Sequence, residues 1–187
     1  LVGEPGIGKS RLLRHLAQAV AARGGQALMA RAFEAELRRP YGIWTDLVRG
    51  IPAGAIRPTL RPLLQPLIGG APVAPAAREG DRMQLYASVL ALLVELAGKA
   101  PTAILLDDLQ WIDEASVALL HALMRECARP GALLIAAAAR PGELADNTPA
   151  SRLVRSLARD GRVQELSLGP LDPAAAAALA SSMAPGQ

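Results

Sequence analysis

The segment "GEPGIGKS", residues 3–10, constrains the fold of this chain more than any other part of the sequence. It fits the pattern G-x-x-x-x-G-K-[S/T], in which glycines let the backbone curl until successive N–H groups point inward at phosphate oxygens. Residues 10–25, "SRLLRHLAQAVAARGG", follow with apolar side chains at helical spacing and two closing glycines. A glycine-rich loop that runs into a helix N-terminus predicts a phosphate-binding loop, and the alternative is a plain Gly/Pro turn before a helix.

The loop predicts particular roles for its residues. Lys9 is expected to neutralise charge on the β- and γ-phosphates, and the Ser10 hydroxyl is expected to ligate Mg²⁺. Composition supports this reading, because the chain has only two lysines among its 20 basic residues and one of them occupies the position where the motif requires lysine. The residues predicted to hold the nucleotide phosphates are Gly3, Glu4, Pro5, Gly6, Ile7, Gly8, Lys9, Ser10 and Arg11.

A second segment, "TAILLDD" at residues 102–108, is typical of a central parallel strand buried on both faces between helix layers. Asp107 is predicted at the carboxyl end of this strand, where α/β sheets bind ligands, and would hold Mg²⁺ through water. Asp108 is the candidate to orient or deprotonate the attacking water. Many hydrolases have glutamate at that place, and aspartate is shorter by one methylene. Arg140 ends the next apolar run and would contact the γ-phosphate, unless it is simply a solvated arginine at a strand end.

Strand and helix patterns alternate along the chain. This alternation predicts an α/β fold, a three-layer α/β/α sandwich around a mostly parallel sheet. Thr148 is the expected N-cap of one helix and Asp172 of the last helix. The expected strands are 26–32, 102–108 and 132–140, all three buried, and 162–168. The expected helices are 10–25, a short one opened by Pro40, 81–98, 113–128, 148–161 and one after Asp172, with irregular structure over 52–78.

Composition excludes several classes of protein. No apolar run reaches the roughly 18 residues that a membrane span requires. The single cysteine, Cys127, excludes an internal disulfide and fits a cytoplasmic protein. The net charge is +3, but the basic residues are scattered and aromatic residues make up only 3% of the chain, so direct nucleic-acid binding by this segment is not predicted.

Four segments together resemble one known family: "GEPGIGKSRLL", "ILLDDLQWIDEAS", "AAARPGEL" and "ELSLGPLD". They are similar to the P-loop ATPase module of the signal-transduction ATPases with numerous domains (STAND), which is grouped near the origin-recognition-complex-like AAA ATPases. Such modules occur in large LuxR-type bacterial regulators and beside class III adenylate and guanylate cyclase domains. The resemblance implies ATP and Mg²⁺ binding, slow hydrolysis, a nucleotide switch, nucleotide-dependent self-association, and sensor and output domains outside this chain.

The resemblance also implies boundaries and site residues. Residues 1–168 would form the ATPase core, and "GPL" at 169–171 would begin a helical lid that extends to 187, with Pro170 touching the adenine. Arg140 matches the arginine after the fourth strand. Because the family has a strand ahead of the loop, we expect the chain to be a fragment cut at both ends, lacking most of its first strand. That strand would lie between the strands that end at Arg140 and Leu168.

Two other functions fit the sequence. A ring-forming AAA ATPase that remodels DNA or protein would need an arginine supplied to a neighbouring subunit, and the candidates lie on one predicted helix: Arg152, Arg155 and Arg159. A scaffold that binds nucleotide without hydrolysing it would fit the aspartate at position 108.

Overall fold

The computed structural model describes residues 1–69, 78–126 and 133–183. The strands β1 (Gln26–Arg31), β2 (Thr102–Asp107) and β3 (Leu133–Ala137) form a parallel sheet in the order β1-β2-β3. The central position predicted for the strand that ends at Asp107 is therefore confirmed. Cys127 and part of the irregular span 52–78 lie outside the described residues.

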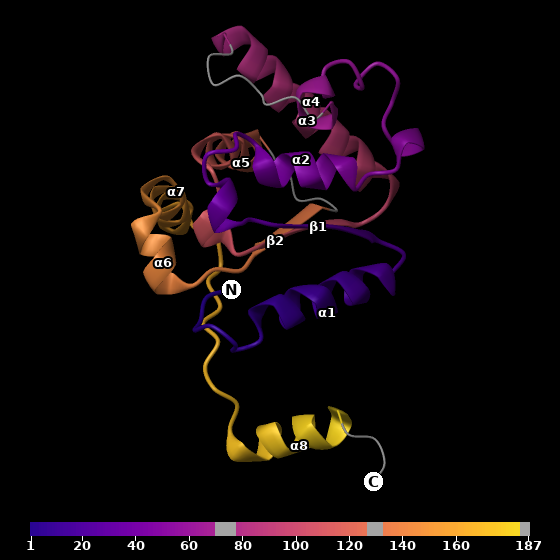
Figure 1. Cartoon of the computed structure of the whole chain (residues 1–187). Helices are drawn as coiled ribbons and strands as arrows, with labels where there is room; N and C mark the ends of the chain where they lie inside the picture. Colours follow the sequence, from indigo (N-terminus) through magenta and orange to yellow (C-terminus); the bar gives the residue numbers. More distant parts are fainter. Residues whose placement is uncertain (70–77, 127–132, 184–187) are drawn as a thin grey trace.

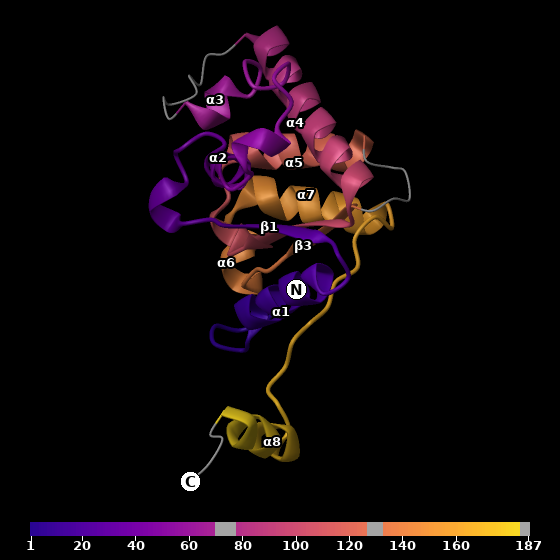
Figure 2. The same cartoon turned by 90° about the vertical axis from the view of Figure 1, so that its right-hand side faces the viewer.

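Helices cover both faces of this sheet (Figure 1). One face carries α1, and α2, α4 and α5 lie over the other face, an arrangement also visible in Figure 2. The predicted three-layer α/β/α sandwich is confirmed. The described helices are α1 (Lys9–Ala21), α2 (Gly42–Arg49), α3 (Gln65–Ile68), α4 (Glu79–Lys99), α5 (Glu114–Glu126), α6 (Pro141–Asp146), α7 (Thr148–Arg159) and α8 (Pro173–Met183), with 3₁₀ turns η1 (Glu34–Glu36), η2 (Ala53–Ala55) and η3 (Leu109–Trp111).

The side chains of β2 alternate between two hydrophobic clusters. Ala103 and Leu105 pack with Leu13 of α1, whereas Ile104 and Leu106 belong to the larger cluster under α2, α4, α5 and α7. All four strand residues are fully buried, and burying a large aliphatic side chain stabilises a fold by about 1.5–3 kcal/mol. The strand at the centre of the sheet is thus fixed from both sides, and so is the position of Asp107 at its end.

The aromatic residues after Pro40 anchor α2 on the larger cluster. Trp44 is 1% exposed, and its indole N–H donates to the Ser116 carbonyl at 3.1 Å. Tyr41 is buried and meets Tyr86 of α4 edge to face at 6.3 Å. Burial and the contact with Tyr86 raise the pKa of Tyr41 above its ordinary value, so this phenol stays neutral and packs as part of the core.

Leu1 and Val2 extend the parallel sheet beyond β3. Val2 forms parallel bridges with both Ala139 and Ser167. Its N–H donates to Leu166 at 3.0 Å, and its carbonyl accepts from Leu168 at 2.8 Å. The residues just before the loop therefore lie between the segments that lead to Arg140 and Leu168, as predicted.

The prediction of a strand over 162–168 is wrong in its length. Only Ser167 bridges, and the bridge is to Val2, because a β-ladder needs a neighbouring backbone along its whole length and this segment has Val2 alone beside it. Next to it, a cavity of about 610 Å³ lies along β3, and Leu134 in its lining is 47% exposed. β3 is consequently half-buried and not the fully buried strand that its sequence predicts.

Three further local predictions need correction. The N-cap of α7 is Asn147, whose side chain accepts from the Ala150 N–H at 3.2 Å, and not Thr148. The helix α6 was not expected, since "PGELAD" is too short to show helical periodicity. β1 lies at one side of the described sheet, which leaves Met29 40% exposed in a strand expected to be buried. The cap by Asp172 is confirmed, because its carboxylate accepts from the Ala175 N–H at 2.7 Å.

Candidate functional site

The glycine-rich loop runs from the Val2 bridges to the first turn of α1. Gly6 and Gly8 have φ angles of 79° and 105°, a region that other residues rarely adopt. Gly3 is needed for a different reason, since a Cβ there would lie 2.8 Å from the Leu168 carbonyl oxygen. The loop thus curls tightly into a helix N-terminus, where the backbone N–H groups of the first turn and the helix dipole favour an anion.

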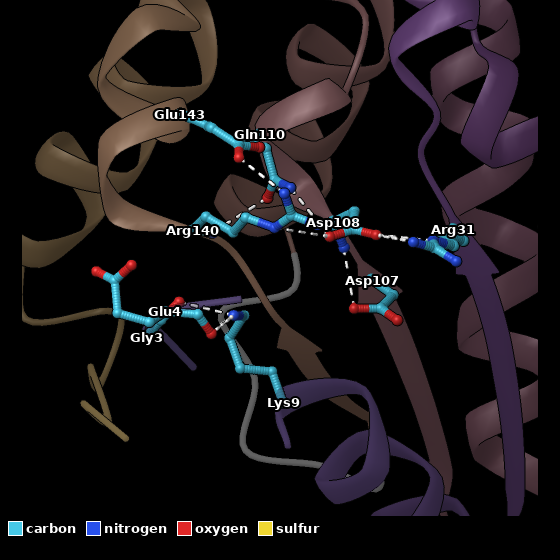
Figure 3. Close-up of polar contacts among 9 residues, drawn as sticks. All are labelled: Gly3, Glu4, Lys9, Arg31, Asp107, Asp108, Gln110, Arg140 and Glu143. Carbon is cyan, nitrogen blue, oxygen red and sulfur yellow. Dashed lines mark hydrogen bonds and ion pairs between the residues drawn. The ribbon is translucent and has the colours of Figure 1, made fainter. Parts of the chain in front are cut away.

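Lys9 is folded back over this loop. It is 7% exposed, and its ammonium donates to the carbonyls of Gly3 at 2.7 Å and Glu4 at 2.9 Å (Figure 3). Ser10 is half-buried beside it in the first turn of α1. The loop therefore holds one buried positive charge and one hydroxyl at the helix start.

The other predicted loop residues differ in exposure. Glu4, Pro5, Gly6 and Arg11 are exposed, and Ile7 is half-buried. Pro170 is also exposed. It lies two residues after Leu168, whose N–H donates to the Val2 carbonyl just before the loop.

The two acids lie at the carboxyl end of β2. Asp107 is 4% exposed, and its Oδ1 accepts from the Asp108 N–H at 3.0 Å. Asp108 follows in the left-handed region with φ 53°, which turns its side chain away from the strand direction. Lys9 and Asp107 lie at the same end of the sheet (Figure 3), so the loop and the acids border one site.

Asp108 is buried and held on both carboxylate oxygens. Arg31 approaches Oδ2 at 2.6 Å from Nη2 and 2.7 Å from Nε, while Gln110 donates to Oδ1 at 2.9 Å. Arg140 faces the same Oδ1 with its Nε at 4.0 Å. Because a carboxylate oxygen can accept two hydrogen bonds, Oδ1 keeps an acceptor site for a water molecule beside Gln110.

Arg140 leaves the sheet just after Ala139 and turns into α6. Its Nη1 bonds Glu143 at 2.8 Å, and this hydrogen bond raises the pKa of Arg140 above its ordinary value. Its backbone N–H donates to Gln110 at 3.2 Å. The arginine therefore carries a permanent charge at the edge of the site, one third exposed and partly committed to Glu143.

Sequence reasoning did not identify Arg31, Gln110 and Glu143 as part of this constellation. Arg31 reaches Asp108 because the register pairs it with Asp107 across neighbouring strands. A basic residue at the end of a predicted strand, beside the strand that ends in acids, was the available signal. For Gln110 the signal was weaker: a polar residue two positions after Asp108 in an otherwise apolar stretch.

The residues present fit a Mg²⁺-bound nucleotide. Mg²⁺ prefers hard oxygen ligands and keeps several waters, with phosphates completing its shell, so one hydroxyl and one carboxylate from the protein suffice. Ser10 and Asp107 offer this pair. Within the described ranges no three His, Cys, Asp or Glu side chains group as an all-protein metal cage would require.

Comparison with protein families decides the class of this site. Residues 1–136 match the family model described as AAA ATPase domain, which is more than half of the 187-residue chain. The chain belongs to the AAA ATPase family. No curated protein matched it.

The matched range of this AAA ATPase domain includes the phosphate loop and both acids, and it ends inside β3. Membership of the family implies nucleotide binding, with ATP hydrolysis and Mg²⁺ as its usual chemistry. The helices in the described part of the chain are all too short or too polar to cross a membrane.

Proposed function

We propose that this domain binds ATP with Mg²⁺, hydrolyses it slowly, and acts as a nucleotide switch within a larger signalling or transcription-regulatory protein. The observation that carries the proposal is that Lys9, at the start of α1, and Asp107, at the carboxyl end of β2, lie at the same end of the sheet (Figure 3). A charged loop and a metal-holding acid at one edge of a parallel sheet are the two halves of a triphosphate site.

The proposed chemistry assigns one task to each residue. Loop amides and Lys9 hold the phosphates, and Ser10 and Asp107 hold Mg²⁺, which neutralises charge on the transferring group. Asp108 accepts a proton from water as the water oxygen bonds to the γ-phosphorus and the bond to ADP breaks. Arg140 contacts the γ-phosphate once its guanidinium is released from Glu143.

We propose further that residues 1–168 form the ATPase core and that a lid begins at Gly169. Figures 1 and 2 support this division, because an extended segment leaves the core and α8 stands apart from the sheet and its helices. Pro170, in that segment, is the residue proposed to contact the adenine. In this view the bound nucleotide holds the lid against the core, and hydrolysis releases it toward sensor and output domains outside this chain.

The substitution Asp108→Asn tests the hydrolytic part of the proposal. We expect ATP affinity to stay within about threefold, while turnover falls about 100-fold, because the amide cannot accept the proton and general-base catalysis contributes 10²–10⁴-fold. ATP affinity is measured by titration with a fluorescent ATP analogue, and turnover by phosphate release. Asp160→Asn, at an exposed position after α7, is the matched control and should change neither quantity.

Unchanged turnover in Asp108→Asn would show that Asp108 is not the base. A second candidate function, nucleotide binding without hydrolysis, is favoured by the occupied state of Asp108, whose two oxygens bond Arg31 and Gln110. Tight ATP binding with no phosphate release from the unsubstituted protein would select that function over the switch driven by hydrolysis.

A further inference from the structure

Gln110 joins two of the groups assigned above to the γ-phosphate end of the site. It lies in the 3₁₀ turn η3, directly after the acids, and is 1% exposed. Its Nε2 donates to Oδ1 of Asp108 at 2.9 Å, and its Oε1 accepts from the backbone N–H of Arg140 at 3.2 Å. One carboxamide thus bridges the end of β2 and the segment after β3 (Figure 3).

The turn that carries Gln110 is itself fixed. The side-chain amide of Asn147, at the start of α7, donates to the backbone carbonyls of Gln110 and Ile112, both at 2.9 Å. The Leu109 N–H bonds the Ala138 carbonyl at 2.8 Å, which ties the same turn to the segment after β3. The carboxamide is therefore presented from a rigid support, with little freedom to adopt another orientation.

The two contacts together require a side chain with both a donor and an acceptor. A carboxamide has a donor and an acceptor on one planar group, so it satisfies Asp108 and the Arg140 N–H at once. Glutamate of the same length would place a second carboxylate against Asp108, and an apolar side chain would leave both groups unpaired in a buried place. Packing alone does not demand glutamine here; the two polar partners do.

We infer that Gln110 is a positioning residue that sets the orientation of Asp108 and of Arg140 relative to each other. The inference rests on the proposed function, in which these two groups act on the attacking water and the γ-phosphate. Its consequence is that loss of the carboxamide should impair steps that involve the γ-phosphate and spare the binding of the rest of the nucleotide.

Gln110→Met tests this inference, because methionine is close to glutamine in size and shape and makes neither hydrogen bond. We expect kcat for phosphate release to fall about 10- to 100-fold, in the range seen for residues that orient a reacting group, with KM changed less than about threefold. The affinity ratio of ATPγS to ADP should fall at least about threefold. Gln84→Met, an exposed glutamine of α4, is the control and should alter none of these values.

A merely structural role would lower stability without lowering kcat and the ATPγS-to-ADP affinity ratio selectively. To test whether the kcat loss acts through Asp108, Gln110→Met is combined with Asp108→Asn. If Gln110 acts through Asp108, adding Gln110→Met to Asp108→Asn should change kcat by less than about threefold. Fully multiplicative kcat losses in the double variant would rule out action through Asp108, and an equal loss of ADP and ATPγS affinity would overturn the inference as a whole. Gln110→His, which keeps one donor and one acceptor nitrogen, should have a higher kcat than Gln110→Met, and a lower value would also contradict it.

The outcomes separate this inference from the proposed function. Failure of the unsubstituted protein to bind any nucleotide would overturn both. Nucleotide binding and hydrolysis that persist unchanged in Gln110→Met would overturn the positioning role alone. If the unsubstituted protein binds without hydrolysis, the ATPγS-to-ADP ratio decides, and an unaltered ratio in the variant refutes the inference.

Discussion

Lys9→Ala is expected to weaken ATP binding roughly 100- to 10,000-fold, which abolishes it at ordinary assay concentrations. The ammonium would form two or more charge-assisted hydrogen bonds with phosphate oxygens, each contributing about 1.5–3 kcal/mol. In the structure this ammonium instead bonds the Gly3 and Glu4 carbonyls of its own loop, so it already lies beside the loop amides that we propose to bind phosphate. Titration with a fluorescent ATP analogue measures the loss.

The chain provides its own control, because it has one other lysine. Lys99 closes α4, is 58% exposed and pairs with Glu95 at 2.9 Å. It precedes β2, whereas the site lies at the carboxyl end of that strand, so Lys99→Ala should keep full affinity. Thermal melting of both variants checks that the fold persists. ATP affinity retained within about threefold in a folded Lys9→Ala protein would refute the phosphate-binding role of the loop.

Asp113→Ala is expected to lower the free energy of unfolding by about 3–5 kcal/mol, a large part of the roughly 5–15 kcal/mol that stabilises an ordinary domain. Asp113 is 5% exposed and accepts four hydrogen bonds. Two come from the N–H and hydroxyl of Ser116 at 2.9 and 2.5 Å, and two from the N–H groups of Tyr41 and Gly42 at 3.0 and 3.2 Å. One carboxylate thus caps α5 and the start of α2 together, and its loss leaves buried donors unpaired.

Chemical denaturation monitored by circular dichroism measures this effect. Glu114→Ala, the exposed neighbour in the first turn of α5, is the control and should cost less than about 1 kcal/mol through the helix dipole. Asp113→Asn keeps one acceptor oxygen, so its loss of unfolding free energy should lie between those of Asp113→Ala and Glu114→Ala. A loss below about 1 kcal/mol in Asp113→Ala would mean that water replaces the carboxylate and that the connection between the two helices is weak.

Much of the fold was predictable because its signals are local. The loop, the helix behind it and the strand ending at Asp107 each follow from a motif, an apolar period or a run of aliphatic residues. The location of the loop and the two acids at one edge of the sheet could also be anticipated, since parallel strands bring their carboxyl ends to the same edge. Where a local signal was short or depended on a partner, prediction failed: α6 is a single short helix, and the segment 162–168 forms a ladder only where Val2 lies beside it.

The sequence by itself determined which chemical groups are available: a curled loop with one lysine, a hydroxyl after it, and two acids at the end of an apolar strand. The tertiary structure decided what those groups touch. The pairing register set Arg31 beside Asp108, and the turn after β2 aimed Gln110 at both Asp108 and the segment after β3. The physical reason is that a motif specifies the local backbone conformation of a few consecutive residues. Contacts across strands depend instead on register and packing, which no short stretch of sequence specifies.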